Sequence, residues 1–215
     1  MKKMHALVIG ATGATGQEIV KFLLKEPDFN KVSIFVRRKI NIKHKKLIVH
    51  KINFSKLNEY KHLLKGDVLF SCLGTTRKES GGKKNQYLVD YTYQYVFAGF
   101  ASKNKVSCYS LVSSVGANKN SFFFYPKIKG TLEDAVKNLE FKKIQIFQPP
   151  ALIRQKELIR SSEKKSIKFI RILNTFGFLK SFKPLPVEFL AKKMVKESLL
   201  NKKENIKTYK PKECF

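Results

Sequence analysis

The sequence predicts an α/β protein in which a doubly wound, mostly parallel sheet is flanked by helices within a single domain, residues 1–215. Two observations predict this class. Short apolar segments alternate with helical periodicity from residue 4 to residue 153, as in a parallel sheet that is covered on both faces. In addition, Gly10, Gly13 and Gly16 join the first apolar segment directly to the first helical one. A chain of 215 residues with 43% hydrophobic content can bury a core without disulfides or metals.

Four apolar segments predict strands in the first half of the chain. Each is rich in β-branched or aromatic residues and is followed by a turn or a helix. In chain order these strands cover Met4–Ile9, Lys31–Val36, Lys46–Ile52 and Asp67–Cys72. Helices are expected over about Ala14–Lys25, which Pro27 ends, and from a cap at Ser55 to Gly66. The polar segment Lys78–Lys84 contains two glycines and is expected to be a flexible loop.

The second half of the chain continues the alternation. Apolar side chains at helical spacing predict a helix over about Gln86–Ser102, and the apolar run that follows predicts a strand over Val106–Val112. The remaining predicted elements are helices over about Tyr125–Leu139, Glu163–Phe178 and Val187–Leu200, and strands over Lys143–Phe147 and Ile206–Tyr209. We expect the part from about residue 150 to residue 215 to close the substrate side of the domain.

The segment Val8–Val20 predicts a nucleotide site. It runs from a strand through the three glycines into a helix, which is the order that a dinucleotide pyrophosphate requires. Gly10 permits a sharp turn, Gly13 permits a close approach of the backbone to phosphate, and Gly16 permits the helix to pack on the strand. The helix N-terminus then offers N–H groups and a positive dipole to the anion. The alternative is a tight strand-to-helix turn that binds nothing.

Arg37 and Arg38 follow the second predicted strand and indicate which dinucleotide is bound. An acidic residue at this position binds the ribose 2′-hydroxyl of NAD, whereas cationic side chains suit the 2′-phosphate of NADP. The sequence therefore favours NADP(H) over NAD(H). The alternative is a solvated charged turn in a lysine-rich protein, but arginine occurs at only six positions, so an adjacent pair is informative. Asn53 and Phe54 follow directly after the third predicted strand, where the adenine is expected to lie in such folds.

The formal net charge of +28 raises the question of a nucleic-acid partner. The excess consists of lysines spread along the chain, and none of the common nucleic-acid-binding signatures is present, so binding to nucleic acid is not favoured. Three scattered cysteines without metal spacing indicate reduced thiols, no metal site and a cytoplasmic location. No apolar run approaches the ~18 residues of a membrane span. A small-molecule substrate is the expected partner, and the oligomeric state stays open.

Tyr125 and Lys129 are candidates for acid–base chemistry. They stand one helical turn apart, so both can face one cleft. A phenol, whose pKa is about 10, exchanges a proton more readily when a cation stabilises its phenolate. Lys129 can supply that charge and hold ribose hydroxyls, while a serine of the pair Ser113-Ser114 can orient a substrate carbonyl. The alternative is an exposed Tyr–Lys pair without a catalytic role.

Four motifs in this order resemble the atypical short-chain dehydrogenase/reductases, and among them the Tat-interacting-protein oxidoreductase group. The motifs are Gly10–Gly16, Leu73–Arg77, Leu111–Ala117 and Tyr125-x-x-x-Lys129-Gly130-x-x-Glu133, and the resemblance covers about residues 4–153. It implies a Rossmann-like NADP-binding domain in which Ser114, Tyr125 and Lys129 are the catalytic positions. The cofactor-binding positions that it implies are Gly10, Thr12, Gly13, Ala14, Thr15, Gly16, Arg37, Arg38, Asn53, Phe54, Cys72, Leu73, Gly74, Thr75, Lys129 and Pro149.

Two features depart from the pattern of this family. Gln148-Pro149-Pro150 stands where many relatives have Arg-Pro-Gly, and the helical Asn that assists proton relay in the wider superfamily has no clear counterpart, although Asp90 lies near that region. The resemblance implies hydride transfer between nicotinamide and a small carbonyl compound or its alcohol, with Tyr125 as general acid/base. Some members have regulatory roles through protein partners. A non-catalytic NADP(H)-binding redox sensor or scaffold is therefore the alternative function.

Overall fold

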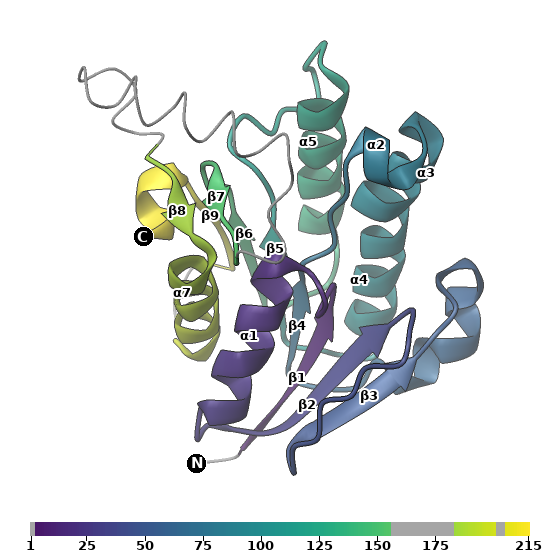
Figure 1. The fold of residues 1–215 in the computed structure, drawn as a ribbon, viewed down its shortest axis with the longest axis vertical. Coiled ribbons are helices and arrows are strands. Elements are labelled where there is room, and N and C mark those ends of the chain that lie inside the picture. Colours follow the sequence, from purple (N-terminus) through teal and green to yellow (C-terminus); the bar gives the residue numbers. More distant parts are fainter. Residues whose placement is uncertain (1–2, 156–182, 201–204) are drawn as a thin grey trace.

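The central sheet contains seven strands, all parallel, in the order β3-β2-β1-β4-β5-β6-β9. The computed structural model describes residues 3–155, 183–200 and 205–215 (Figure 1). The strands of this sheet are β1 (Met4–Ile9), β2 (Phe29–Val36), β3 (Leu47–Lys51), β4 (Val68–Ser71), β5 (Cys108–Val112), β6 (Lys143–Phe147) and β9 (Ile206–Tyr209). Strand order reverses between β1 and β4. The predicted fold class is confirmed.

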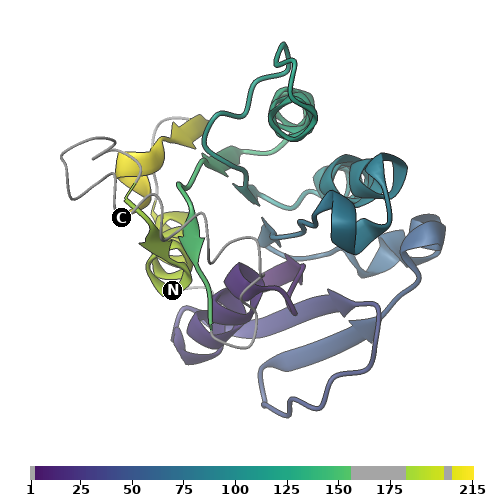
Figure 2. The ribbon, with the colours of Figure 1, turned by 45° about the horizontal axis from the view of Figure 1, so that its top comes forward.

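The two faces of the sheet carry separate hydrophobic layers. Along β1, Ala6 and Val8 belong to a core that includes α1 (Ala14–Lys25) and α7 (Val187–Leu199). The alternate residues, Leu7 and Ile9, belong to a core that includes α4 (Tyr93–Lys103) and α5 (Phe124–Lys137). Figure 2 shows the two pairs of helices on opposite sides of the sheet. Because successive side chains of a strand point to opposite faces, the complete burial of four consecutive residues of β1, Ala6 to Ile9, requires this double covering.

Three segments differ from the sequence prediction. After β3 the chain forms a 3-10 helix, η1 (Phe54–Leu63), which is capped by the side chain of Asn53 instead of Ser55. The segment predicted as a loop contains α2 (Arg77–Ser80) and the start of α3 (Lys83–Tyr87). A capping box between Thr76 and Glu79 stabilises α2. Between α3 and α4 lies one stretch of π-helix, η2 (Leu88–Thr92), where an α-helix was expected.

The C-terminal part adds three more elements among the described residues. The short strands β7 (Leu152–Ile153) and β8 (Leu185–Pro186) pair in parallel as a second, small sheet. A 3-10 helix, η5 (Pro211–Cys214), follows β9. The helix predicted over Glu163–Phe178 lies outside the described residues. Among the helices that the structure describes, none has the length and hydropathy needed to cross a bilayer.

Two histidines that flank Ser33 of β2, His5 on β1 and His50 on β3, make stability depend on pH. His5 and His50 lie 2.9 and 3.4 Å from the Ser33 hydroxyl through their Nε2 atoms. Burial, with Lys31 nearby, lowers the pKa of His5 to about 4 and also lowers the pKa of His50. The folded state therefore binds fewer protons than the unfolded state between pH 6.5, the model-peptide value, and pH 4.

We therefore expect the free energy of unfolding to decrease as the pH is lowered from 6.5 toward 4, and to be insensitive to these groups above that window. Urea titrations at closely spaced pH values measure this. His5→Gln should flatten the decrease, because Gln does not titrate. His44→Gln, on an exposed loop position, is the control. An unchanged slope in His5→Gln would contradict the assignment.

Candidate cofactor-binding and catalytic site

A cleft of about 890 Å³ opens at the carboxyl ends of β1, β2, β3 and β4. It lies beside the point between β1 and β4 where the strand order reverses, which is where ligands bind in open α/β sheets. Its walls come from the glycine loop, the ends of β2 and β3, and the segment from Cys72 to Tyr93. A cleft of this volume accommodates a dinucleotide.

The glycine loop has the geometry that its sequence predicts. Gly10 has φ +78°, and a Cβ at this residue would lie 2.5 Å from the carbonyl carbon of Cys72. The loop is closed by a hydrogen bond from Gly13 N–H to the Gly10 carbonyl oxygen at 3.0 Å. Gly13 is the N-cap of α1 and has no side chain to accept from the first turn. The first N–H groups of α1 therefore stay available for an anion.

Most of the predicted cofactor-binding residues line this cleft. They are Gly10, Thr12, Gly13, Arg37, Asn53, Phe54, Cys72, Leu73, Gly74 and Thr75. The other positions do not contribute to its walls. Ala14, Thr15 and Gly16 are buried in the first turn of α1, and Arg38 is exposed beside Arg37. Lys129 is buried on α5 against the end of β5, and Pro149 is buried just after β6.

Two charged residues of the cleft were missed by sequence reasoning. Lys51 is the last residue of β3 and pairs in register with Val36, so it lies beside Arg37 at the end of the adjacent strand. Glu79 lies across the cleft, where its carboxylate accepts hydrogen bonds from Thr76 N–H and from the Thr75 hydroxyl. The signal for Lys51 was its position just before Asn53, at a predicted strand end.

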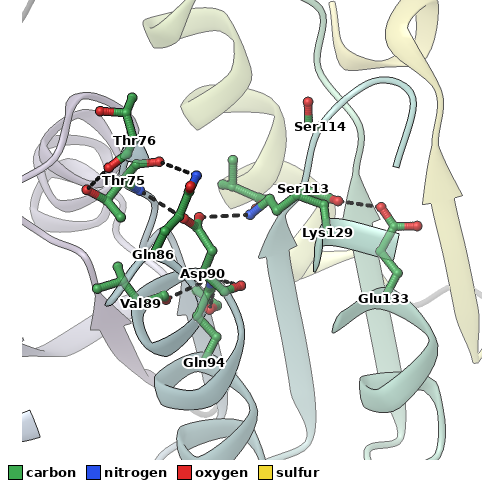
Figure 3. Close-up of polar contacts among 12 residues, drawn as sticks. Thr75, Thr76, Gln86, Val89, Asp90, Gln94, Ser113, Ser114, Lys129 and Glu133 are labelled. Atoms are coloured by element: carbon green, nitrogen blue, oxygen red, sulfur yellow. Dashed lines mark hydrogen bonds and ion pairs between the residues drawn. The ribbon is translucent and has the colours of Figure 1, made fainter. Parts of the chain in front are cut away.

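Lys129 is fixed in the interior next to the cleft. Only 2% of its side chain is exposed, and its Nζ donates a hydrogen bond of 3.1 Å to the Val112 carbonyl oxygen at the end of β5. The same Nζ lies 4.0 Å from Oδ1 of Asp90, whose side chain is fully buried (Figure 3). Lys129 is therefore an interior residue, and the alternative of an exposed Tyr–Lys pair does not describe it.

Asp90 connects this lysine to the cleft wall. Its Oδ2 accepts a hydrogen bond from Thr75 N–H at 3.4 Å, and its backbone carbonyl accepts one from Gln94 at 2.9 Å. Asp90 lies in the middle of the π-helix η2, which is an uncommon element that occurs frequently at functional sites. The buried ion pair thus joins α5, η2 and the loop after β4.

The two serines at the end of β5 have different surroundings. The Ser113 hydroxyl donates to the Glu133 carboxylate on α5 and is buried (Figure 3). The Ser114 hydroxyl is half-buried and donates to the Val115 carbonyl oxygen at 3.2 Å. Ser114 is therefore the more available of the two for a substrate. Tyr125 lies in the first turn of α5 and is 40% exposed, and it does not contribute to the cleft walls.

Glu133 and Gln148 form a second buried polar cluster beside the site. Gln148 Nε2 donates to both carboxylate oxygens of Glu133, at 3.0 and 2.9 Å, and its Oε1 accepts from Lys210 Nζ at 3.0 Å. Gln148 is the residue that replaces the expected arginine. The cluster ties α5 to the ends of β5 and β6, and the cation of Lys210 reaches it through the amide of Gln148.

Cys72 contributes its backbone and apolar volume to the cleft, not a reactive thiolate. Burial raises the pKa of its thiol to about 12, and only the nearby charge of Lys129 opposes this. The thiol is therefore protonated at neutral pH and is a poor nucleophile.

The parallel sheet, the glycine loop and the cleft at the strand reversal define a dinucleotide-binding protein of the Rossmann type. Consistent with this class, the sequence profile of the NAD(P)H-binding family matches residues 10–152.

Sequence comparison also identifies known proteins that are similar to this chain. Protein HTATIP2 of Rattus norvegicus is 33% identical over 173 residues, which are 79% of this chain and 71% of that protein. The mitochondrial protein FMP52 of Kluyveromyces lactis is 36% identical over 155 residues, which are 71% of this chain and 69% of that protein. The chain belongs to the NAD(P)H-binding family of atypical short-chain dehydrogenase/reductases that includes these relatives.

Solved structures share the fold at much lower identity. The enzyme WbmH of Bordetella bronchiseptica in complex with NAD+ has a TM-score of 0.75 and 13% identity, and covers 97% of this chain and 75% of its own. The UDP-N-acetylglucosamine 4-epimerase of Methanobrevibacter ruminantium has a TM-score of 0.71 and 18% identity, and covers 98% of this chain and 77% of its own. These matches support the fold alone.

Proposed function

We propose that this protein is an NADP(H)-dependent oxidoreductase that interconverts a small carbonyl compound and its alcohol. When bound, the cofactor supplies or accepts the hydride at the substrate carbon. In the reduction, the Tyr125 hydroxyl gives its proton to the carbonyl oxygen as the hydride reaches the carbon. In the oxidation, the Tyr125 phenolate takes the alcohol proton. Ser114 orients the oxygen, and Lys129 stabilises the phenolate and holds the ribose.

The observation that carries this proposal is the buried position of Lys129. Burying a lysine side chain of which only 2% is exposed lowers the stability of the folded state, since its ammonium group must be desolvated. Here the charge is held by the Val112 carbonyl oxygen at the end of β5 and by Asp90 in η2, and Lys129 lies one helical turn from Tyr125. Packing alone would be served as well by an apolar side chain, so a fixed cation here supports a role in chemistry.

The preference for NADP(H) is supported by two cations at one end of the cleft. Arg37 and Lys51 both line it, and they come from the carboxyl ends of the paired strands β2 and β3. A ribose 2′-phosphate carries charge that two such side chains neutralise, whereas a 2′-hydroxyl gains little from them. Arg38 is exposed and lies outside the lining, so we assign the second phosphate contact to Lys51.

Replacing Arg37 by Ala or Lys51 by Met is expected to weaken NADPH binding by about tenfold each, because each removes one charge-assisted contact to phosphate. NADH binding should hardly change. Isothermal titration calorimetry of both cofactors at one salt concentration measures this, and Arg38→Ala serves as the matched control. Equal losses for NADH and NADPH would refute the 2′-phosphate assignment, as would a loss in Arg38→Ala as large as that in Arg37→Ala.

The remaining parts of the proposal concern the substrate and the setting. We place the substrate on the β5–α5 side of the site. That the C-terminal part, about residues 150–215, closes this side stays a prediction, and residues 156–182 and 201–204 of it lie outside the described residues. We propose a cytoplasmic location, which is supported by the three free thiols. The FMP52 relatives are named mitochondrial proteins.

A non-catalytic NADP(H)-binding sensor is the second candidate, and the position of Tyr125 favours it, since this residue is 40% exposed and outside the cleft walls. The two functions differ in turnover. We would measure NADPH oxidation with a panel of aldehydes and ketones, and NADP+ reduction with a panel of alcohols, to distinguish the two functions. Cofactor binding without turnover on the whole panel would favour the sensor, and failure to bind NADPH would refute both.

A further inference from the structure

The loop between β5 and α5 carries large apolar side chains that no other described part of the chain covers. Phe122 is 104% exposed and Phe123 is 77% exposed, whereas Phe29, Phe35 and Phe70 are almost completely buried. Phe123 is also the N-cap of α5, a position where Ser, Thr, Asp or Asn would stabilise the helix. Neither core packing nor helix capping therefore accounts for these residues. Exposed apolar clusters of this kind mark interaction surfaces.

The loop projects beyond the carboxyl edge of the sheet, and in Figure 1 it forms the top of the molecule above α5. The segment Ala117–Pro126 contains no acidic residue. The loop projects from the molecule, and both phenylalanine side chains are exposed on it. We call Phe122 and Phe123 with their flanking residues 117–126 the aromatic tip.

Basic residues lie within the aromatic tip and on the adjoining segments. Lys83 Nζ, at the start of α3, lies 5.4 Å from the centre of the Phe124 ring, so α2 and α3 adjoin the tip. The basic residues on these segments are Arg77, Lys78, Lys83, Lys84, Lys119 and Lys127. Two acidic residues lie nearby. Glu79 is turned to Thr75 and Thr76, and Asp134 pairs with Lys119 at 2.7 Å and with Lys137 at 3.6 Å. The face around the tip therefore keeps an excess of positive charge.

We infer that the aromatic tip docks this protein onto an anionic lipid bilayer. Phe122 and Phe123 enter the interface between headgroups and acyl chains, and the surrounding lysines contact the lipid phosphates. Bilayer interfaces bind apolar side chains that are flanked by lysine and arginine. Single-stranded nucleic acid also binds cations and aromatic rings, but it does so along a groove with successive stacking platforms. A projecting tip with adjacent phenylalanines fits a lipid surface better.

Insertion can be followed at one residue, because the chain contains no tryptophan. In Phe122→Trp the emission is expected to shift to the blue with vesicles of phosphatidylcholine and phosphatidylserine, and to be quenched by brominated lipid. Vesicles of phosphatidylcholine alone should give little shift. Phe189→Trp is the matched control, since Phe189 is 59% exposed on α7 and remote from the tip. An unshifted and unquenched spectrum of the Phe122→Trp variant would overturn the inference.

Binding is tested separately by co-sedimentation with the same vesicles. The double variant Phe122→Ser/Phe123→Ser is expected to bind about tenfold or more weakly, because its apolar insertion is lost, while Phe189→Ser should bind like the parent. Circular dichroism and NADPH binding show whether the variants are folded. Equal vesicle binding by the parent and the double variant would show that surface charge alone accounts for the binding, and would refute the role of the tip.

Two other occupants give different results, and each would overturn the inference. If the tip joins two copies of this chain, light scattering without lipid would show a mass that falls in the double variant. If it binds nucleic acid, a single-stranded oligonucleotide would lose affinity in the double variant while vesicle binding stays unchanged.

Discussion

Tyr125→Phe is expected to lower kcat by about 10²–10⁴-fold, the range that general acid–base catalysis contributes. The substitution removes only the hydroxyl that exchanges the proton with the substrate oxygen. Tyr125 does not line the cleft in which we propose that the cofactor binds, so the affinity for NADPH should stay nearly constant. Stability should also change little, because the residue is 40% exposed in the first turn of α5.

Steady-state turnover with a substrate found in the carbonyl panel measures this effect, and calorimetry gives the NADPH affinity of the same variant. Tyr87→Phe is a suitable control, since Tyr87 is similarly exposed, at 39%, and lies on α3. Full activity in Tyr125→Phe would remove this residue from the mechanism. A matching loss in Tyr87→Phe would show that loss of an exposed phenol is not specific to the reaction site.

The glycine spacing and the alternation of strands and helices were sufficient to predict the fold and several of the residues that line the cleft. Gly10 shows why, since its turn and its contact with Cys72 are backbone requirements that only one residue type meets. Positions at strand ends followed from the fold in the same way. Arg37, Asn53 and Thr75 were placed at the cleft because parallel strands bring their carboxyl ends to one edge.

Contacts between distant residues could not be predicted in this way. Asp90 was expected on an ordinary helix, and no sequence pattern indicated the π-helix that places its carboxylate against Lys129. The family resemblance selected Ser114 over Ser113, but the residues alone left the choice open, because the environment of Ser113 depends on its hydrogen bond to Glu133 on α5. Lys51 was missed because a lysine at a strand end in a lysine-rich chain carries little information until the strand register is known.

Gln148, which stands where many relatives have an arginine, illustrates the same limit. The sequence shows the departure, but only the structure shows that Lys210 at the end of β9 brings a cation to the same cluster. An amide between Glu133 and Lys210 satisfies both partners by hydrogen bonds without placing a second charge in the interior. The loss of the arginine therefore leaves the ends of β5, β6 and α5 connected.

Lys129→Met is expected to reduce the free energy of unfolding by about 3–5 kcal/mol, because the buried carboxylate of Asp90 loses its cation. Urea denaturation measures the change. Lys127→Met, on the exposed side of the same helix, should change stability by less than about 0.5 kcal/mol. A loss in Lys129→Met no larger than in Lys127→Met would show that the ion pair at 4.0 Å contributes nothing to stability.

The double variant Asp90→Asn/Lys129→Met separates the structural role of Lys129 from its proposed catalytic role. Because both charges are removed together, its stability should exceed that expected from adding the two single losses, with a coupling of about 0.5–3 kcal/mol. Activity should not recover with it, since Met cannot stabilise a phenolate or hold a ribose. If both stability and turnover returned in the double variant, Lys129 would act only as the partner of Asp90, and the chemistry proposed for Tyr125 would have to proceed without a neighbouring cation.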